Sequence, residues 1–169
     1  MLKKNDTDQA IGRSKGGLST KIHAVVDALG NPTAFVLTPG QACDLDGSDQ
    51  LLPNIEANAV LADKAYDAED RVIDLLRAAG KEIVIPPKRN RKEQRSYDKE
   101  LYKARHLIEN FFCKLKQFRA IATRYDKTAR NFLAAIHLAA TTIWLIWWQT
   151  LDICHGYKIS SFILLLKLS

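Results

Sequence analysis

Four polar side chains of complementary chemistry recur at intervals that suit one face of a helix. They are Tyr102, Arg105, Glu109 and Lys116. At 100° per residue they fall within a sector of roughly 60°. An acid beside two cations and a phenol can hold a metal ion and contact phosphate groups. The alternative is a solvated face on which Arg105 and Glu109 form an ordinary i,i+4 ion pair.

A second acidic residue stands where a charge is costly. Asp63 directly follows the unbroken apolar run 59–62, which has the character of a strand buried inside a sheet. A carboxylate at the end of such a strand needs a cation or a metal as partner. A strand-end Asp and a helical Glu can converge on a hard cation, which accepts carboxylate and phosphate oxygens. Asp63 and Glu109 are therefore the candidate catalytic and metal-binding residues.

A cluster of cations lies between the apolar segment 83–85 and the helical face. These cations are Lys88, Arg89, Arg91, Lys92 and Arg95. They could form a solvated loop, but their place after a strand of the candidate site favours contacts with DNA phosphates.

The charge balance agrees with a polyanionic partner. The net charge is +6, and residues 81–130 carry about 9 positive charges in excess whereas residues 1–80 carry about 4 negative charges in excess. Nucleic acid is the commonest partner of such a basic region, although basic structural proteins and membrane-surface modules share it. The three cysteines are too far apart for a disulfide framework or a zinc site. With polar residues after Met1 and no apolar run long enough to span a bilayer, the sequence predicts a cytoplasmic protein with no membrane partner.

The elements that must position these residues follow from periodicity. Apolar residues spaced by three and four predict an amphipathic helix over about 98–118. Alternating or unbroken apolar runs predict strands at 21–27, 33–38, 59–62 and 83–85. Further helices are predicted within 42–58, at 67–79 with Asp67 as N-cap, and from about 128 onward. The first two strands should form an antiparallel hairpin. This order predicts a mixed α/β sheet with helices packed on it.

The spacing of the helical face is similar to a known signature. Tyr, two residues, Arg, three residues, Glu, six residues, Lys resembles the motif around the catalytic Glu of bacterial insertion-sequence DDE transposases, of the fifth numbered insertion-sequence family. Residues 62–67 resemble the block with that family's second catalytic Asp. Residues 12–23 and 37–41 resemble its preceding strands. The resemblance covers roughly residues 10–145.

The resemblance implies an RNase H-like fold and a reaction. Three carboxylates would hold two Mg2+ (or Mn2+) ions about 3.5–4 Å apart. Asp63 would be the second carboxylate and Glu109 the third. Arg105 and Lys116 would contact backbone phosphate, and Tyr102 would position a base or sugar. The implied partners are double-stranded DNA, as transposon ends and as target, and further copies of the chain in a homo-oligomer. The protein would be associated with the nucleoid when bound.

The first carboxylate of the resembled family has no counterpart here. In that family it lies on a strand before the block Gly16–His23, and the chain starts too late to contain it. Asp6 and Asp8 stand in a polar arm, and Asp27 is expected to be a hairpin residue. The predicted fold is thus an RNase H-like mixed sheet with flanking helices and its N-terminal strand missing.

Three hypotheses follow. The first is a fragment of a transposase that performs Mg2+-dependent phosphodiester hydrolysis and strand transfer, with this chain alone inactive. The second is a catalytically inactive DNA-binding remnant. The third, a basic structural or RNA-binding protein, leaves Asp63 and Glu109 unexplained. We expect a flexible polar arm at 1–19, a partial catalytic domain at 20–146 and a divergent apolar tail at 147–169.

Overall fold

A hairpin of alternating residues starts the sheet. In the computed structural model, which describes residues 9–151 and 162–168, β1 (Gly12–Ser14) leads into β2 (Gly17–Val26), which pairs antiparallel with β3 (Pro32–Pro39). Asp27 organises the turn between β2 and β3, because its Oδ1 accepts the N–H groups of Leu29 and Asn31, each at 2.9 Å. The predicted hairpin is confirmed, and the Asp27 carboxylate accepts hydrogen bonds from the backbone of the hairpin turn.

Two parallel strands continue the sheet. β4 (Ala59–Ala62) has every side chain buried, and it pairs in parallel with β5 (Glu82–Val84). The connection contains η2 (Lys64–Tyr66), a π-helical turn η3 (Glu69–Ile73) and α2 (Asp74–Ala78), and Gly80 ends it with a φ of +65°. That conformation is accessible to glycine at little cost, so the predicted stop at Gly80 has its physical reason.

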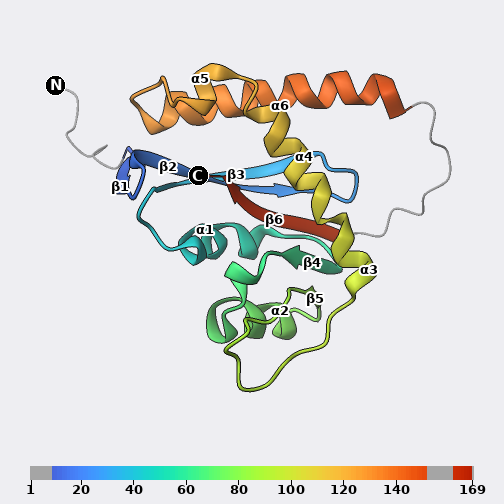
Figure 1. Ribbon diagram of the computed structural model, residues 1–169. Coiled ribbons are helices and arrows are strands. Elements are labelled where there is room, and N and C mark those ends of the chain that lie inside the picture. The colour runs from blue at the N-terminus through green and yellow to red at the C-terminus, as the bar shows by residue number, and fades with distance from the viewer. Residues whose placement is uncertain (1–8, 152–161, 169) are drawn as a thin grey trace.

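The centre of the sheet is filled by a segment from far along the chain. β6 (Phe162–Leu168) lies between β2 and β4, giving the order β1-β2-β6-β4-β5, with β3 on β2 (Figure 1). It runs antiparallel to β2 and parallel to β4. Within the predicted tail at 147–169, residues 147–151 belong to a helix, residues 152–161 and 169 lie outside the described part, and β6 lies in the sheet.

Helices cover both faces of this sheet. α1 (Asp44–Leu51) with η1 (Leu52–Asn54) lies on the same side as α2, whereas the opposite side carries α4 (His106–Leu115), α5 (Arg119–Ala122) and α6 (Ala129–Leu151) (Figure 1). Because successive strand residues point to opposite faces, Ala59 and Leu61 join the cluster under α4 and α6, and Val60 and Ala62 join the cluster over α1 and α2. The predicted mixed α/β arrangement is confirmed.

The long amphipathic helix is one helical segment with a tighter turn inside it. α3 (Lys99–Tyr102), the 3-10 turn η4 (Lys103–Arg105) and α4 follow one another without a break, and Asp98 caps the start by accepting the N–H groups of Glu100 and Leu101. Ile108, Phe111 and Leu115 are buried in the core beneath it. The predicted apolar stripe is confirmed, but the helix ends at Leu115 rather than near Phe118.

Strands and long-range contacts occupy part of the segment 1–19. Residues 12–14 and 17–19 belong to strands, and Gln9 and Ala10 contact residues near the start of α6. Gln9 Oε1 accepts the N–H of Ala129 at 2.8 Å, at the first residue of α6, and Arg124 donates to the carbonyl of Ala10 at 2.9 Å. The periodicity of residues 9–19 gave no sign of these contacts, because their partners lie more than 100 residues away.

Helix α6 meets the length and hydropathy criteria for crossing a membrane over Ala129–Ile146. Core helices meet the same criteria. Phe132, Ile136 and Ile143 of α6 pack into the cluster against α4 and the sheet, whereas Leu138 and Leu145 are exposed. One face of α6 therefore packs in the hydrophobic core.

Interrupting β6 should destabilise the whole sheet. We expect Leu165→Pro to lower the free energy of unfolding by about 3 kcal/mol or more, since proline removes a backbone donor from a strand paired on both sides. Leu165→Val keeps the donor and should cost far less. Urea unfolding followed by circular dichroism measures both, and equal stabilities of the two variants would mean that β6 does not hold this position in solution.

Candidate active site

The end of β4 delivers Asp63 to the face covered by α4. Asp63 continues the alternation of Ala59 and Leu61, which point toward that helix. Its Oδ1 accepts the N–H of Ala65 at 3.2 Å, which caps η2 and orients the carboxylate. The other oxygen, Oδ2, faces Arg105 at 3.6 Å from Nη1.

Arg105 joins the two candidate carboxylates. Its Nη2 lies 2.7 Å from Glu109 Oε1, one helical turn further along, while its Nη1 faces Asp63. The side chains of Asp63, Arg105 and Glu109 are 37%, 26% and 45% exposed, so the cluster is open to solvent and to ligands. Two carboxylates 46 positions apart in the sequence thereby meet at one guanidinium.

Tyr102 flanks this cluster. The Arg105 guanidinium carbon lies 5.7 Å from the centre of the Tyr102 ring, and Tyr97 packs edge-on against the same ring at 5.5 Å. Burial raises the pKa of the Tyr102 phenol, although the neighbouring Arg105 works in the opposite direction. The phenol therefore stays protonated at neutral pH and can donate a hydrogen bond.

Lys116 occupies a different place. It is the C-cap of α4, seven residues beyond Glu109 and thus roughly 10 Å further along the helix axis. Its side chain is exposed and lines a cavity of about 290 Å³ with residues of β2, α5 and α6, among them Leu18, Ile121 and Phe132. Lys116 can reach a ligand that extends along α4, but it belongs to another part of the surface than the carboxylates.

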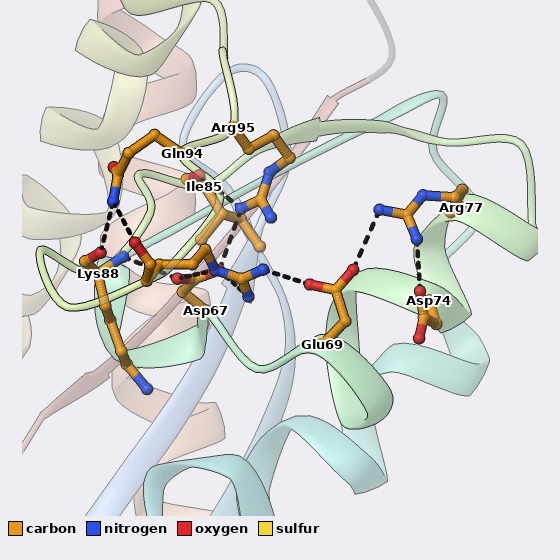
Figure 2. Close-up of polar contacts among 9 residues, drawn as sticks. Asp67, Glu69, Asp74, Arg77, Ile85, Lys88, Gln94 and Arg95 are labelled. Atoms are coloured by element: carbon orange, nitrogen blue, oxygen red, sulfur yellow. Dashed lines mark hydrogen bonds and ion pairs between the residues drawn. The ribbon is translucent and has the colours of Figure 1, made fainter.

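The basic loop after β5 is fastened to a buried carboxylate. The side chain of Asp67 is only 1% exposed, and it lies among donors from the loop (Figure 2). Its Oδ2 accepts the backbone N–H of Lys88 at 2.7 Å and Arg91 Nε at 2.9 Å, and Arg95 Nη2 lies 3.2 Å from Oδ1. Arg91 also pairs with Glu69.

This network divides the cations that were predicted to contact DNA. Arg91 and Arg95 hold the loop against Asp67, with Arg95 also donating to the Ile85 carbonyl at 3.0 Å. Arg89 and Lys92 are exposed, and Lys88 is half-buried. The free members of the loop are thus Arg89 and Lys92, whose side chains face solvent while the loop is fixed beneath them.

The prediction that Asp67 is a helix N-cap is wrong. Ala68 holds that position at the start of η3, and the Asp67 carboxylate turns to the loop instead. The sequence offered one signal for this role: Asp67 lies on the connection after the buried run 59–62, where an enclosed acid needs a cationic partner, and five cations follow the neighbouring strand. Periodicity alone favoured the local cap.

The donors around Asp67 set its protonation. Burial raises the pKa of the Asp67 carboxyl, but the hydrogen bonds from the Lys88 N–H, Arg91 and Arg95 outweigh burial and hold the pKa below its ordinary value of 3.8. Asp67 is therefore charged at neutral pH, and its buried charge is neutralised by Arg91 and Arg95.

Asp63 and Glu109 suit a magnesium ion by their chemistry. Within residues 9–151 and 162–168, no group of three or more His, Cys, Asp or Glu side chains is placed to hold a metal. Mg2+, however, is commonly bound through one or two protein carboxylates, with water and substrate phosphate completing its shell. The pair therefore fits a single ion. β6, which lies beside β4, contains no acidic residue that could add a ligand.

Comparison with known proteins places the chain in a family. The model of the transposase DDE domain matches residues 3–144. The chain belongs to this family. It is 41% identical over 132 residues to a putative transposase for insertion sequence element IS6501 from Brucella ovis, covering 76% of this chain and 99% of the relative. It is 32% identical over 162 residues to a putative transposase for insertion sequence element IS402 from Burkholderia cepacia, covering 87% of this chain and 68% of that relative. No solved structure matches it.

The family match agrees with the recognition made from motifs. The matched range contains the hairpin, β4 with Asp63, the basic loop and the helical segment with Glu109. This transposase DDE domain is a mixed α/β structure in which the continuous helical segment α3–η4–α4 brings the motif residues Tyr102, Arg105 and Glu109 beside Asp63 at the end of β4.

Removing the Asp67 charge should destabilise the domain. Asp67→Asn removes the counter-charge of Arg95 and one of the two carboxylates paired with Arg91, and we expect a loss of about 3 kcal/mol at pH 7, measured by urea unfolding. Exposed Asp70→Asn is the matched control and should stay within about 0.5 kcal/mol.

The pH dependence follows from the lowered pKa of Asp67. A carboxyl whose folded pKa lies below its unfolded pKa stabilises the fold fully above the unfolded value, near 3.8, and loses this contribution as the pH falls through the folded pKa. The stability difference between the wild type and Asp67→Asn should therefore be constant from pH 6 to 8 and shrink below about pH 4. A difference that grows on acidification would contradict the assigned role.

Proposed function

We propose that this transposase domain performs Mg2+-dependent (or Mn2+-dependent) phosphodiester hydrolysis and strand transfer at the ends of an insertion sequence, as one copy within a homo-oligomer on double-stranded DNA. The observation that carries the proposal is the convergence of Asp63 and Glu109 on Arg105, at 3.6 and 2.7 Å, at the open end of a buried strand. The antiparallel pair β2–β3, the parallel pair β4–β5 and helices on both faces support an RNase H-like fold.

Each residue of the cluster has a role in this proposal. Asp63 and Glu109 hold the metal, which when bound supplies positive charge to the scissile phosphate and to the attacking and leaving oxygens. Arg105 presents planar N–H donors to a phosphate oxygen. Tyr102 offers a phenol and a ring face to a base or sugar, and Lys116 contacts the backbone further along α4.

The two steps use the same bond changes at phosphorus. In hydrolysis, a water oxygen bonds to phosphorus as the bond from phosphorus to the 3′ oxygen breaks, leaving a 5′-phosphate and a 3′-hydroxyl, and the proton lost by water is balanced by the one gained at the 3′ oxygen. In strand transfer, the oxygen of that 3′-hydroxyl bonds to a phosphorus of the target DNA as the bond from this phosphorus to the target 3′ oxygen breaks, and the proton lost by the attacking hydroxyl is balanced by the one gained at the released target 3′ oxygen. Neither step needs an oxidant or reductant.

The fixed basic loop supplies the DNA-binding surface. Arg89 and Lys92, with half-buried Lys88, stand on a loop anchored between β5 and α3, in the part of the chain with the positive charge excess. Exposed cations on an anchored backbone can follow DNA phosphates without a further ordering cost.

A second candidate function has its own observation. β6 lies beside β4, whose end carries Asp63, and β6 contributes no carboxylate, so the described residues provide two acidic groups where the resembled family has three. A domain with this site can bind transposon DNA without cutting it. The alternative function is thus a catalytically inactive DNA-binding remnant.

One assay separates the two functions. Purified chain is incubated with supercoiled plasmid and Mg2+ or Mn2+, and nicking is followed on gels beside binding at low salt. For the enzyme we expect Asp63→Asn and Glu109→Gln to lower nicking by about 100-fold or more while DNA binding persists. Binding by the wild type without nicking would contradict enzymatic activity of the isolated chain and agree both with the remnant and with the expectation that this chain alone is inactive. Full nicking by Glu109→Gln would remove that residue from the metal site.

The division of the basic loop predicts different phenotypes for its arginines. Arg89→Gln and Lys92→Gln should each weaken DNA binding and reduce the slope of log affinity against log salt by about 1, since each removes one phosphate contact. Arg91→Gln should instead lower stability, because it breaks the pair with Asp67. Fluorescence anisotropy across a salt series measures the slopes, with exposed Arg77→Gln on α2 as control. An unchanged slope for both Arg89 and Lys92 variants would place the DNA elsewhere.

A further inference from the structure

We propose that Arg105 is an internal counter-cation that a divalent metal displaces, so that metal binding releases the same guanidinium to bind phosphate. The inference rests on the proposed metal role of Asp63 and Glu109, and it concerns what this chain's own arginine does between its two states.

Asp63 and Glu109 bring two negative charges to one place, and the Arg105 guanidinium is in ion-pair contact with both. Like charges at short range are unfavourable unless a cation lies between them. In the metal-free protein that cation is Arg105.

Arg105 is close to Glu109, at 2.7 Å, and looser at Asp63, at 3.6 Å, so it bridges the pair without a bidentate bond to the strand-end carboxylate. A magnesium ion holds oxygen ligands at about 2.0–2.1 Å. A magnesium ion at this site would be held by the carboxylates of Asp63 and Glu109, the groups that Arg105 contacts. Metal and guanidinium are therefore competitors for one position.

The displaced Arg105 guanidinium has a second contact in the same cluster. The Tyr102 ring, 5.7 Å from the guanidinium carbon, is a second support that does not depend on the carboxylates. Arg105 is half-buried and stays charged, so once the metal has taken its partners it has unused N–H donors beside a metal ion. A DNA phosphate oxygen is the acceptor that suits both. Metal and phosphate binding should then favour each other, and the coupling must be reciprocal.

The simplest competing view is that Arg105 serves only as an i,i+4 partner that stabilises the helix. On that view the guanidinium keeps its contact with Glu109 when metal is added. The two views differ in what happens to one side chain.

The Arg105 side chain can be observed directly. In the 15N-labelled full chain, its Nε–Hε resonance is assigned as the one missing from Arg105→Gln, and Mg2+ is titrated without DNA. We expect this resonance to move with saturation, while that of Arg77, paired with Asp74 and Glu69 on α2, stays in place. Metal binding detected by calorimetry without movement of the Arg105 signal would overturn the inference and leave the metal site intact.

A binding cycle tests the coupling. The affinity of a short DNA duplex is measured with and without Ca2+, which binds carboxylates without supporting cleavage, for the wild type, Arg105→Gln, Arg105→Lys and the control Arg77→Gln. We expect metal to tighten DNA binding about 5-fold or more in the wild type and in Arg77→Gln, and to have little effect in Arg105→Gln. Arg105→Lys retains the charge without the planar fork, so its coupling should be intermediate.

The outcomes separate the inference from the function on which it rests. If the wild type binds neither Mg2+ nor Ca2+, the proposed metal-dependent function fails. If it binds metal and Arg105→Gln shows the same coupling to DNA as the wild type, the function stands and the exchange of partners at Arg105 is wrong. If Arg105→Lys matches the wild type in full, net charge rather than displacement of a bridging guanidinium explains the coupling, which also overturns the inference.

Discussion

The burial of strand β4 on both faces constrains the rest of this domain. All four of its residues are at most 5% exposed, so none of them can present a charged side chain to solvent or to a ligand. The acidic residues of this region therefore follow the strand, where the backbone leaves the sheet. Asp63 is the first such residue and Asp67 follows on the same connection. The neighbouring segments then determine the partners of these acids: η4 supplies Arg105, α4 supplies Glu109, and the loop before α3 supplies Arg91 and Arg95.

Two acidic centres with opposite properties result. Asp67 is enclosed, with its side chain 1% exposed and its donors provided by the loop, and its charge serves to fix that loop. Asp63 and Glu109 are 37% and 45% exposed and share one cation. A buried pair is costly to break because a charge would be left without solvent, whereas an open pair can exchange its cation for another. The first centre is therefore suited to structure and the second to binding.

The position of β6 links stability to function. β6 pairs with β2 of the hairpin on one side and with β4 of the parallel pair on the other (Figure 1). Without β6, these two strands would each have an unpaired edge. Its sequence, Phe-Ile-Leu-Leu-Leu-Lys-Leu, contains no carboxylate. The sheet is complete, while its acidic cluster has two members among the described residues.

The sequence by itself determined the features that depend on near neighbours in the chain. The β2–β3 hairpin, the buried run before Asp63, the stop at Gly80 and the apolar stripe of α4 all follow from periodicity and turn chemistry, because these signals act over a few residues. The motif spacing around Glu109 also identified the family. Only the tertiary structure decided the pairings across long separations. In the structure, Asp67 binds the basic loop instead of capping a helix, and Arg91 and Arg95 pair with Asp67 instead of facing solvent. Gln9 contacts the start of α6, and β6 lies between β2 and β4. Such partners are chosen by which faces meet when the core is buried, and a one-dimensional pattern does not contain that choice.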